Sequence, residues 1–169
     1  MTKQDNRRDL LIVWHSRTGG AEAMAAAARD GALEQDGASC RLLRAEEAMP
    51  GDLLAAGALL VVCPENLAAM TGAMKEFFDR CYYPVLGRIE GLAYATAIAA
   101  GSDGDNATQQ IDRIATGWRL RRVADPLICN FHAQTPEEIL APKQLDDADR
   151  TRCTDLGAAL AAGLAMGVF

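Results

Sequence analysis

A short polar loop follows the first apolar run of the chain, and it carries residue types that bind phosphate. The run spans residues 10–14, and the six residues after it are His15, Ser16, Arg17, Thr18, Gly19 and Gly20. Two hydroxyls and a guanidinium can contact an anion, and the glycines let the backbone approach it closely. A helix that starts here also directs free N–H groups and its positive dipole end at the loop. The pattern indicates either a phosphate loop or an ordinary turn whose hydroxyls only cap a helix.

The composition is that of one globular domain spanning residues 1–169. Hydrophobic residues make up 50% of the chain and charged residues 24%, which allows a substantial core. The formal net charge of −6 argues against nucleic acid or an anionic membrane as the main partner. The polar residues 1–9 are followed by only five apolar ones, so we expect neither a signal peptide nor a membrane span at the amino end.

The cysteines and histidines offer no recognisable metal or catalytic motif. The chain has five cysteines, an odd number without a C-x-x-C pair: Cys40, Cys63, Cys81, Cys129 and Cys153. Their apolar or helical neighbours predict reduced, buried thiols in a cytoplasmic protein, not a disulfide framework or a zinc site. His15 and His132 both fall beside strand ends, but neither is assigned as a general base, and no catalytic residue is assigned.

Five apolar runs separated by helical patterns predict an α/β fold. The expected strands are residues 10–14, 40–44, 58–63, 92–100 and 127–131, with Pro64 ending the third. The expected helices cover residues 20–35, the stretch from Thr71 to Pro84, the surroundings of residues 111–118, a start at Thr135 and residues 146–165. Because most of the runs are continuous rather than alternating, we expect a parallel sheet with helices on both faces.

Two side-chain patterns are read as structural rather than functional. Helical spacing places four apolar residues on one core-facing helix stripe: Met74, Phe77, Phe78 and Cys81. Three cations are expected to end the helix around residue 118 and to complement its dipole, rather than to bind a phosphate: Arg119, Arg121 and Arg122.

Three polar loops follow the predicted strand ends and point to one binding site. They cover residues 15–20, 64–70 and 101–106, and each contains glycine or proline. In doubly wound sheets, ligands bind at the carboxyl ends of the strands, where the strand order reverses. The agreement of the three loops is stronger evidence for a site than any single motif.

Two of these loops resemble those of flavodoxin-like proteins. The first, S-R-T-G-G-A, resembles the flavodoxin phosphate loop [ST]-x-T-G-x-T at Ser16, Thr18 and Gly19, with Ala21 where the final Thr usually stands. The run V-V-C-P-E-N-L-A-A-M-T-G-A-M-K-E-F-F-D-R, residues 61–80, resembles the second flavin loop of flavodoxin-like FMN reductases. The resemblance implies a flavodoxin-like, doubly wound, five-stranded parallel sheet of order 2-1-3-4-5 with helices on both faces.

The resemblance also implies an FMN lying across the strand ends. The phosphate would be held by Ser16, Arg17, Thr18, Gly19, Gly20 and Ala21. The isoalloxazine would be lined by Pro64, Glu65, Asn66 and Leu67, and its other edge would be covered by Gly101, Ser102, Asp103 and Gly104. The second and third loops contain no aromatic residue to stack on the flavin, and the nearest aromatic candidates are Trp14, Tyr82, Tyr83 and Phe131.

The function that this resemblance implies is an FMN-dependent oxidoreductase. It would take electrons from NAD(P)H and pass them to a quinone, a flavin or a similar small acceptor, and an open flavin face would suit that role. The alternatives are a flavodoxin-like electron carrier that needs a partner reductase, and a relative that keeps the fold without the flavin. Relatives of the reductase kind also suggest a homo-oligomer. Two other classes of protein with a similar architecture are excluded. The first loop lacks the cysteine that begins the corresponding loop of a small tyrosine phosphatase. The first and third strands lack the terminal aspartates of a response-regulator receiver.

Overall fold

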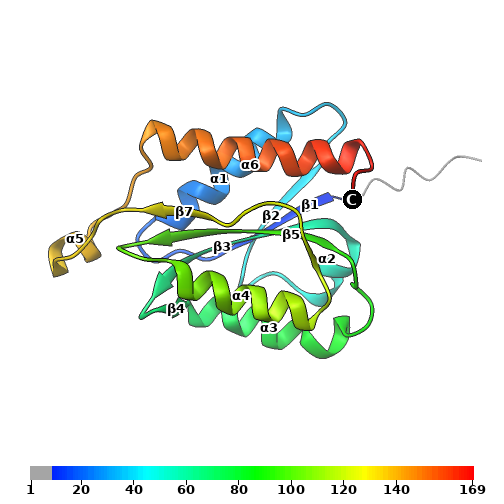
Figure 1. Ribbon diagram of the computed structural model, residues 1–169, viewed down its shortest axis with the longest axis horizontal. Helices are drawn as coiled ribbons and strands as arrows, with labels where there is room; N and C mark the ends of the chain where they lie inside the picture. The colour runs from blue at the N-terminus through cyan, green and yellow to red at the C-terminus, as the bar shows by residue number, and fades with distance from the viewer. Residues whose placement is uncertain (1–8) are drawn as a thin grey trace, which may run out of the picture.

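The computed structural model describes residues 9–169, which form one twisted sheet between two layers of helices (Figure 1). The main strands are all parallel: β1 (Asp9–Trp14), β2 (Cys40–Arg44), β3 (Ala56–Asn66), β5 (Ala93–Ala100) and β7 (Leu127–Asn130). They lie in the order β2-β1-β3-β5-β7, so the expected order 2-1-3-4-5 is confirmed. Two short strands complete the sheet: β4 (Ala69–Met70) is antiparallel to the end of β3, and β6 (Arg121–Arg122) pairs with the start of β5.

The central strands form because their side chains are apolar on both faces. Residues 10–13 of β1 are fully buried, and every residue of β5 is buried. A strand that is covered on both sides cannot alternate polar and apolar residues, which explains the continuous runs in the sequence. The alanine-rich β5 leaves room for helices to approach the sheet closely.

The helices divide between the two faces of the sheet, as Figure 1 shows. One face is covered by α1 (Gly20–Leu33) and α6 (Asp147–Ala165), and the other by α2 (Pro50–Ala55), α3 (Gly72–Val85) and α4 (Asp105–Gly117). The short helix α5 (Pro136–Leu140) buries none of its residues and projects beyond the end of the sheet. The segment that carries it, residues 131–146, is called the arm below. None of the helices in the described part of the chain is both long and apolar enough to span a bilayer.

Several expected element boundaries differ from the structure. Pro64 does not end β3, because it pairs in register with Ala99 and the strand continues to Asn66. Likewise, α3 includes Pro84 and ends one residue later. The expected strand at residues 127–131 ends at Asn130. The core-facing stripe on α3 is confirmed, since all four of its apolar residues are buried.

The expected basic helix terminus was wrong. Helix α4 ends before the three arginines, with Trp118 as its last capping residue. Arg121 and Arg122 form β6, where Arg122 pairs with Asp112, and Arg119 adopts a left-handed backbone conformation with φ of 56° and pairs with Glu90. Arg119 and Arg122 are therefore held by nearby carboxylates, and none of the three arginines lies in the last turn of α4.

All five cysteines are free thiols in the structure. Four of them are buried, and Cys40 is half-buried. Burial raises the pKa of the Cys40 and Cys81 thiols to about 11 and that of Cys63 to about 12, which keeps these three protonated at neutral pH.

Candidate functional site

The sheet brings the three predicted loops together at one edge. They follow the carboxyl ends of β1, β3 and β5, which are neighbours in the sheet. The register places Trp14 beside Val62 and Pro64 beside Ala99, and the His15 amide donates to the Val62 carbonyl at 3.0 Å. The connections leave β1 and β3 in opposite directions, which makes this the switch point of a doubly wound sheet.

The first loop presents the free end of a helix. The Gly19 amide donates to Ser16 Oγ at 3.0 Å, which closes the loop into a tight turn. Gly19 has a φ of 96° and is the N-cap residue of α1, so no side chain caps the first turn of this helix. Its leading N–H groups and the positive end of its dipole face the loop, as an anion site requires.

Ala21 and Arg17 differ in how they could contribute to that site. Ala21 is 1% exposed and packs in the core, so it could contact a ligand only through its backbone N–H. Arg17 is exposed, so its guanidinium is free to contact an anion from the solvent side. Position 21, where the flavodoxin phosphate loop usually carries a threonine, therefore packs in the core and offers no hydroxyl to a phosphate.

The arm runs directly beside the first loop, which the sequence pattern did not predict. The Lys143 amide donates to the Thr18 carbonyl at 2.7 Å. A Cβ added at Gly20 would lie 2.9 Å from the Phe131 ring and 3.3 Å from Cβ of Lys143. The missing side chain at Gly20 thus lets the arm pack against the loop, while the Lys143 ammonium is bound within the arm by the carbonyls of Glu138, Ile139 and Ala141.

The second loop is a tight hairpin that connects β3 to β4. Leu67 and Ala68 form its tip with φ values of 53° and 56°, a conformation that costs energy for residues other than glycine. The Leu67 side chain is 96% exposed. Asn66 is also exposed, whereas Pro64 and Glu65 are half-buried.

The Glu65 carboxylate has a role that its place in the sequence motif did not predict. It accepts hydrogen bonds from the Gly104 amide at 2.9 Å and the Ala107 amide at 3.0 Å. Glu65 therefore caps α4 and ties the second loop to the third. Two more bonds join the hairpin to α4, since Gln110 Oε1 accepts from the Met70 amide and Asn106 donates to the Ala68 carbonyl.

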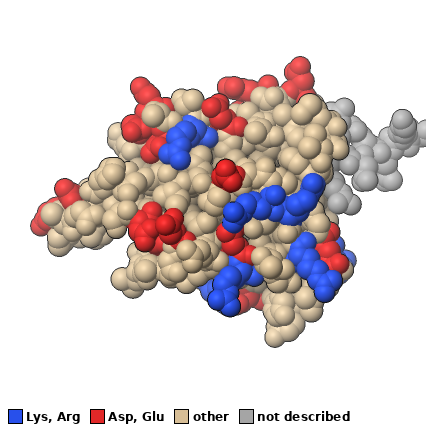
Figure 2. All heavy atoms as spheres, viewed as in Figure 1, with Lys and Arg blue, Asp and Glu red and all other residues tan. Residues whose placement is uncertain are grey.

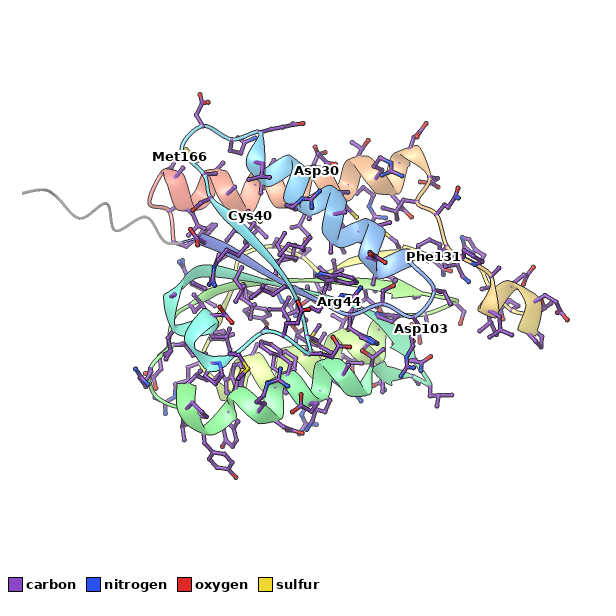
Figure 3. The ribbon with its side chains drawn as sticks, turned by 180° about the vertical axis from the view of Figure 1, so that it is seen from behind. Asp30, Cys40, Arg44, Asp103, Phe131 and Met166 are labelled. Carbon is purple, nitrogen blue, oxygen red and sulfur yellow. The ribbon has the colours of Figure 1, made fainter. Side chains whose placement is uncertain are left out.

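The third loop is held from its other side by β7 and the arm. Asn130 Nδ2 donates to the Ser102 carbonyl at 2.8 Å, and the Ala133 amide donates to the Gly101 carbonyl at 2.9 Å. Gly104 has a φ of 103°, and a Cβ there would lie 2.8 Å from Cγ2 of Ile128. Asp103 is exposed; in Figure 3 it lies with Phe131 toward the end of the sheet from which the arm projects.

A small charged cluster borders the first loop. Nε2 of His15 lies 3.6 Å from Oε1 of Glu46, and the Arg44 guanidinium lies 4.7 Å from the centre of the Trp14 ring. Burial of the imidazole lowers the pKa of His15; nearby Arg17 and Arg44 lower it further, and Glu46 opposes them. His15 is therefore a neutral imidazole at neutral pH, which gives it no role as an anion-binding cation.

The aromatic candidates are placed differently from one another. Trp14 is 8% exposed and lies against Arg44, so it has no open face for stacking. Tyr82 and Tyr83 lie at the carboxyl-terminal end of α3, near the start of β5 and therefore at the opposite edge of the sheet. Phe131 lies beside the candidate site, where its ring is close to Gly20 of the first loop.

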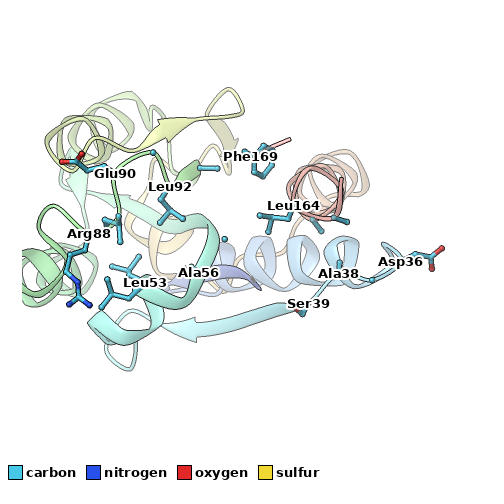
Figure 4. Close-up of a pocket in the computed structure, with 18 residues that line it drawn as sticks. Asp36, Ala38, Ser39, Leu53, Ala56, Arg88, Glu90, Leu92, Leu164 and Phe169 are labelled. Carbon is cyan, nitrogen blue, oxygen red and sulfur yellow. The ribbon is translucent and has the colours of Figure 1, made fainter. Parts of the chain in front are cut away.

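One well-formed cavity among the described residues is not part of this site. It measures about 670 Å³ and is lined by residues at the amino ends of the strands, including Ser39, Ala56 and Ala93 (Figure 4). The three loops lie at the opposite, carboxyl edge. Within residues 9–169, no group of three or more His, Cys, Asp or Glu side chains is arranged to hold a metal ion.

Solved structures identify the architecture. A flavodoxin from the domain Archaea superposes on 92% of this chain and 98% of its own length, with a TM-score of 0.74 and 18% identity. The fold is flavodoxin-like. The two-electron-reduced flavodoxin of Megasphaera elsdenii has the same flavodoxin-like arrangement, with a TM-score of 0.70, 19% identity and coverage of 90% of this chain and 98% of that one.

One curated protein is similar to this chain in sequence. A flavodoxin of Aquifex aeolicus is 34% identical over 98 residues, which are 57% of this chain and 53% of that protein. The match thus spans about half the length of the curated relative. No protein-family model matches the sequence.

Proposed function

We propose that this flavodoxin-like protein binds FMN and acts as an electron carrier between redox partners. The observation that carries the proposal is the convergence of three loops at the switch point, with an uncapped helix N-terminus in the first. A phosphate ester fits that end because backbone N–H groups and the helix dipole both favour an anion. FMN supplies the chemistry when bound, because its ring system accepts and returns electrons.

The residues of the chain would divide the binding of FMN between them. Ser16 to Ala21 would hold the phosphate through backbone N–H groups and hydroxyls, with Arg17 supplying positive charge nearby. The second and third loops, Pro64 to Leu67 and Gly101 to Gly104, would border the ring system. Glu65 would act only by holding these two loops together, because its carboxylate is already bonded to α4.

The carrier is favoured over a reductase by the likeness in sequence, since the 34% identical relative is named a flavodoxin. A carrier also fits the net charge of −6, which would attract basic surfaces on partner proteins. Five free thiols fit a reducing compartment such as the cytoplasm.

The second candidate function is an NAD(P)H-dependent reductase of a quinone, a flavin or a similar small acceptor. It is supported by the composition of the second and third loops, since neither contains an aromatic side chain. Without such a cover, a nicotinamide could approach the flavin face.

Binding of FMN and riboflavin tests the cofactor. Titration of each into the purified protein, followed by flavin fluorescence, should show tight binding of FMN and much weaker binding of riboflavin, which lacks the phosphate. Ser16→Ala should weaken the binding of FMN at least several-fold, because Ser16 Oγ holds the Gly19 amide in the loop. The same change should leave the affinity for riboflavin unchanged. Equal binding of both ligands would count against the phosphate loop, and binding of neither would refute the proposal.

Addition of NADH and NADPH under anaerobic conditions then separates the two candidates. A carrier keeps its oxidised flavin absorbance unless a partner reductase is added. A reductase loses it within seconds to minutes and regains it when a quinone is supplied. Gel filtration of the same samples gives the oligomeric state, which the reductase candidate predicts to be a homo-oligomer.

A further inference from the structure

Two buried thiols meet between β7 and α6, outside the candidate FMN site. Cys129 on β7 and Cys153 on α6 are 0% and 1% exposed, and their sulfur atoms lie 4.0 Å apart. They are 24 positions apart in the sequence. A disulfide needs a sulfur–sulfur distance of about 2.05 Å, so the two side chains must approach by about 2 Å. Nothing in the proposed electron-carrier function uses this pair.

We propose that Cys129 and Cys153 form a reversible intramolecular disulfide, with a small disulfide of the glutathione type as the oxidant. The proposal does not depend on FMN binding. These two cysteines differ from the other three, since none of those lies in contact with another thiol among the described residues.

The two thiols of the pair differ in how readily they ionise. The Arg152 guanidinium donates to the Ile128 carbonyl at 3.2 Å and to the Asp149 carboxylate at 2.7 Å, so a paired cation and carboxylate with opposing effects lie beside the cysteines. The hydrogen bond from Cys129 lowers the pKa of Cys153, and the same contact, together with burial, raises that of Cys129. Cys153 is therefore the thiol that ionises first.

The exchange reaction proceeds in two balanced steps. The Cys153 thiolate attacks one sulfur of the small disulfide, which forms a mixed disulfide on Cys153 and releases one small thiolate. Cys129 then loses its proton to solvent and attacks the Cys153 sulfur, which releases the second small thiolate. Overall, two protein thiols are oxidised to one disulfide while one small disulfide is reduced to two thiols.

The local structure provides access to the pair and gives the disulfide a consequence. Cys129 lies on the four-residue strand β7 at the edge of the sheet, and the arm that follows carries a helix without buried residues. Such segments open locally at low cost. The disulfide closes a loop from Cys129 to Cys153 that contains the whole arm, including Lys143 beside the first loop. It should therefore shift the unfolding midpoint in urea to a higher concentration.

Thiol counting in the native protein tests the proposal. The protein is incubated with oxidised glutathione, its remaining thiols are alkylated in denaturant, and the products are mapped by mass spectrometry. We expect three of the five thiols to be alkylated and one peptide pair to be linked through Cys129 and Cys153. Alkylation of all five, or linkage of this pair only when oxidation is done in denaturant, would overturn the proposal.

Three variants sharpen the result. Cys129→Ser should retain a stable glutathione adduct on Cys153, because the second attacking thiol is absent, whereas Cys153→Ser should form much less adduct on Cys129. Cys40→Ser is the matched control and should form the same disulfide as the parent protein. A disulfide that uses Cys40, in the parent protein or in either of the other variants, contradicts the proposed pairing. If a serine variant fails to fold, the peptide map of the parent protein decides alone.

Discussion

At the scale of single residues, Glu65 joins two parts of the candidate site that lie about 40 positions apart in the sequence. Its carboxylate accepts the amides of Gly104 and Ala107, and the Gly104 backbone has a left-handed conformation that positions the third loop. The sequence analysis placed Glu65 beside a flavin ring because it lies in a flavin-loop motif. The structure adds a contact of the Glu65 carboxylate with α4, and no local pattern could have revealed that contact.

Removal of this carboxylate should loosen the third loop. Glu65→Ala leaves the Gly104 and Ala107 amides without their acceptor, which should cost about 1–2 kcal/mol of unfolding free energy. Urea unfolding measures the loss, and hydrogen exchange of these two amides should become faster. The exposed Glu47→Ala is the control and should change stability by less than about 0.5 kcal/mol. Unchanged protection of both amides would show that another group holds the loop.

His15 should make stability depend on pH. Burial lowers the pKa of His15 below the ordinary value of 6.5, so the unfolded chain binds a proton before the folded protein does. The contribution of His15 to the free energy of unfolding is therefore complete above pH 6.5, and it is lost progressively as the pH falls through the lower pKa of His15 in the folded protein.

Urea midpoints at about pH 7.5 and 5.5 test this dependence. The parent protein should lose more stability on acidification than His15→Gln. The exposed His132→Gln is the matched control and should behave like the parent. A parent protein and His15→Gln with the same pH dependence would contradict the assignment.

At the scale of elements, the approach of α1 and α6 depends on two glycines. A Cβ added at Gly157 would lie 1.8 Å from the Ala28 carbonyl oxygen, and one at Gly31 would lie 2.0 Å from that of Thr154. Backbone atoms cannot rotate away from such a contact as a side chain can. The two helices can approach this closely only because both positions lack a side chain.

Alanine at either glycine should force the two helices apart. We expect Gly157→Ala and Gly31→Ala each to cost at least about 3 kcal/mol, because the strain falls on backbone. Gly117→Ala in α4 is the control, since nothing lies within 4 Å of its added Cβ. That change should stabilise the protein by about 0.5 kcal/mol through the unfolded chain. Thermal unfolding of the three variants gives the comparison, and equal melting temperatures would refute the packing argument.

The sequence predicted the main elements because their signals are local. Continuous apolar runs determined the strands, and Thr135 with Glu138 correctly indicated the start of α5, where both halves of a capping box form. The site was predictable as three loops because parallel strands carry their carboxyl ends to one edge. Tertiary contacts decided the remaining features: Pro64 extends a strand already held by β5, and Lys143 reaches the first loop across the sheet.

At the scale of the whole molecule, the arm differs from the body of the protein in its charge and its shape. In Figure 2, acidic side chains lie on the projecting end that carries α5, and the basic side chains of this face lie on the body. The exposed residues Ile139 and Leu140 also lie on α5. The arm is anchored to the body at its two ends, where Ala133 bonds to Gly101 and Lys143 bonds to Thr18.

This arrangement predicts that the outer part of the arm is dispensable for folding. Replacement of residues 134–141 by a short Gly-Ser linker keeps both anchors and removes a helix that buries nothing. Stability should change by less than about 1 kcal/mol, because the cost of closing a loop depends weakly on its length. Leu145→Ala, at the buried root of the arm, should instead cost about 2–4 kcal/mol by leaving a cavity. Circular dichroism and urea unfolding measure both variants. If the linker variant lost cooperative unfolding, α5 would contribute to the core in solution, and the arm would have to be regarded as part of the folded body.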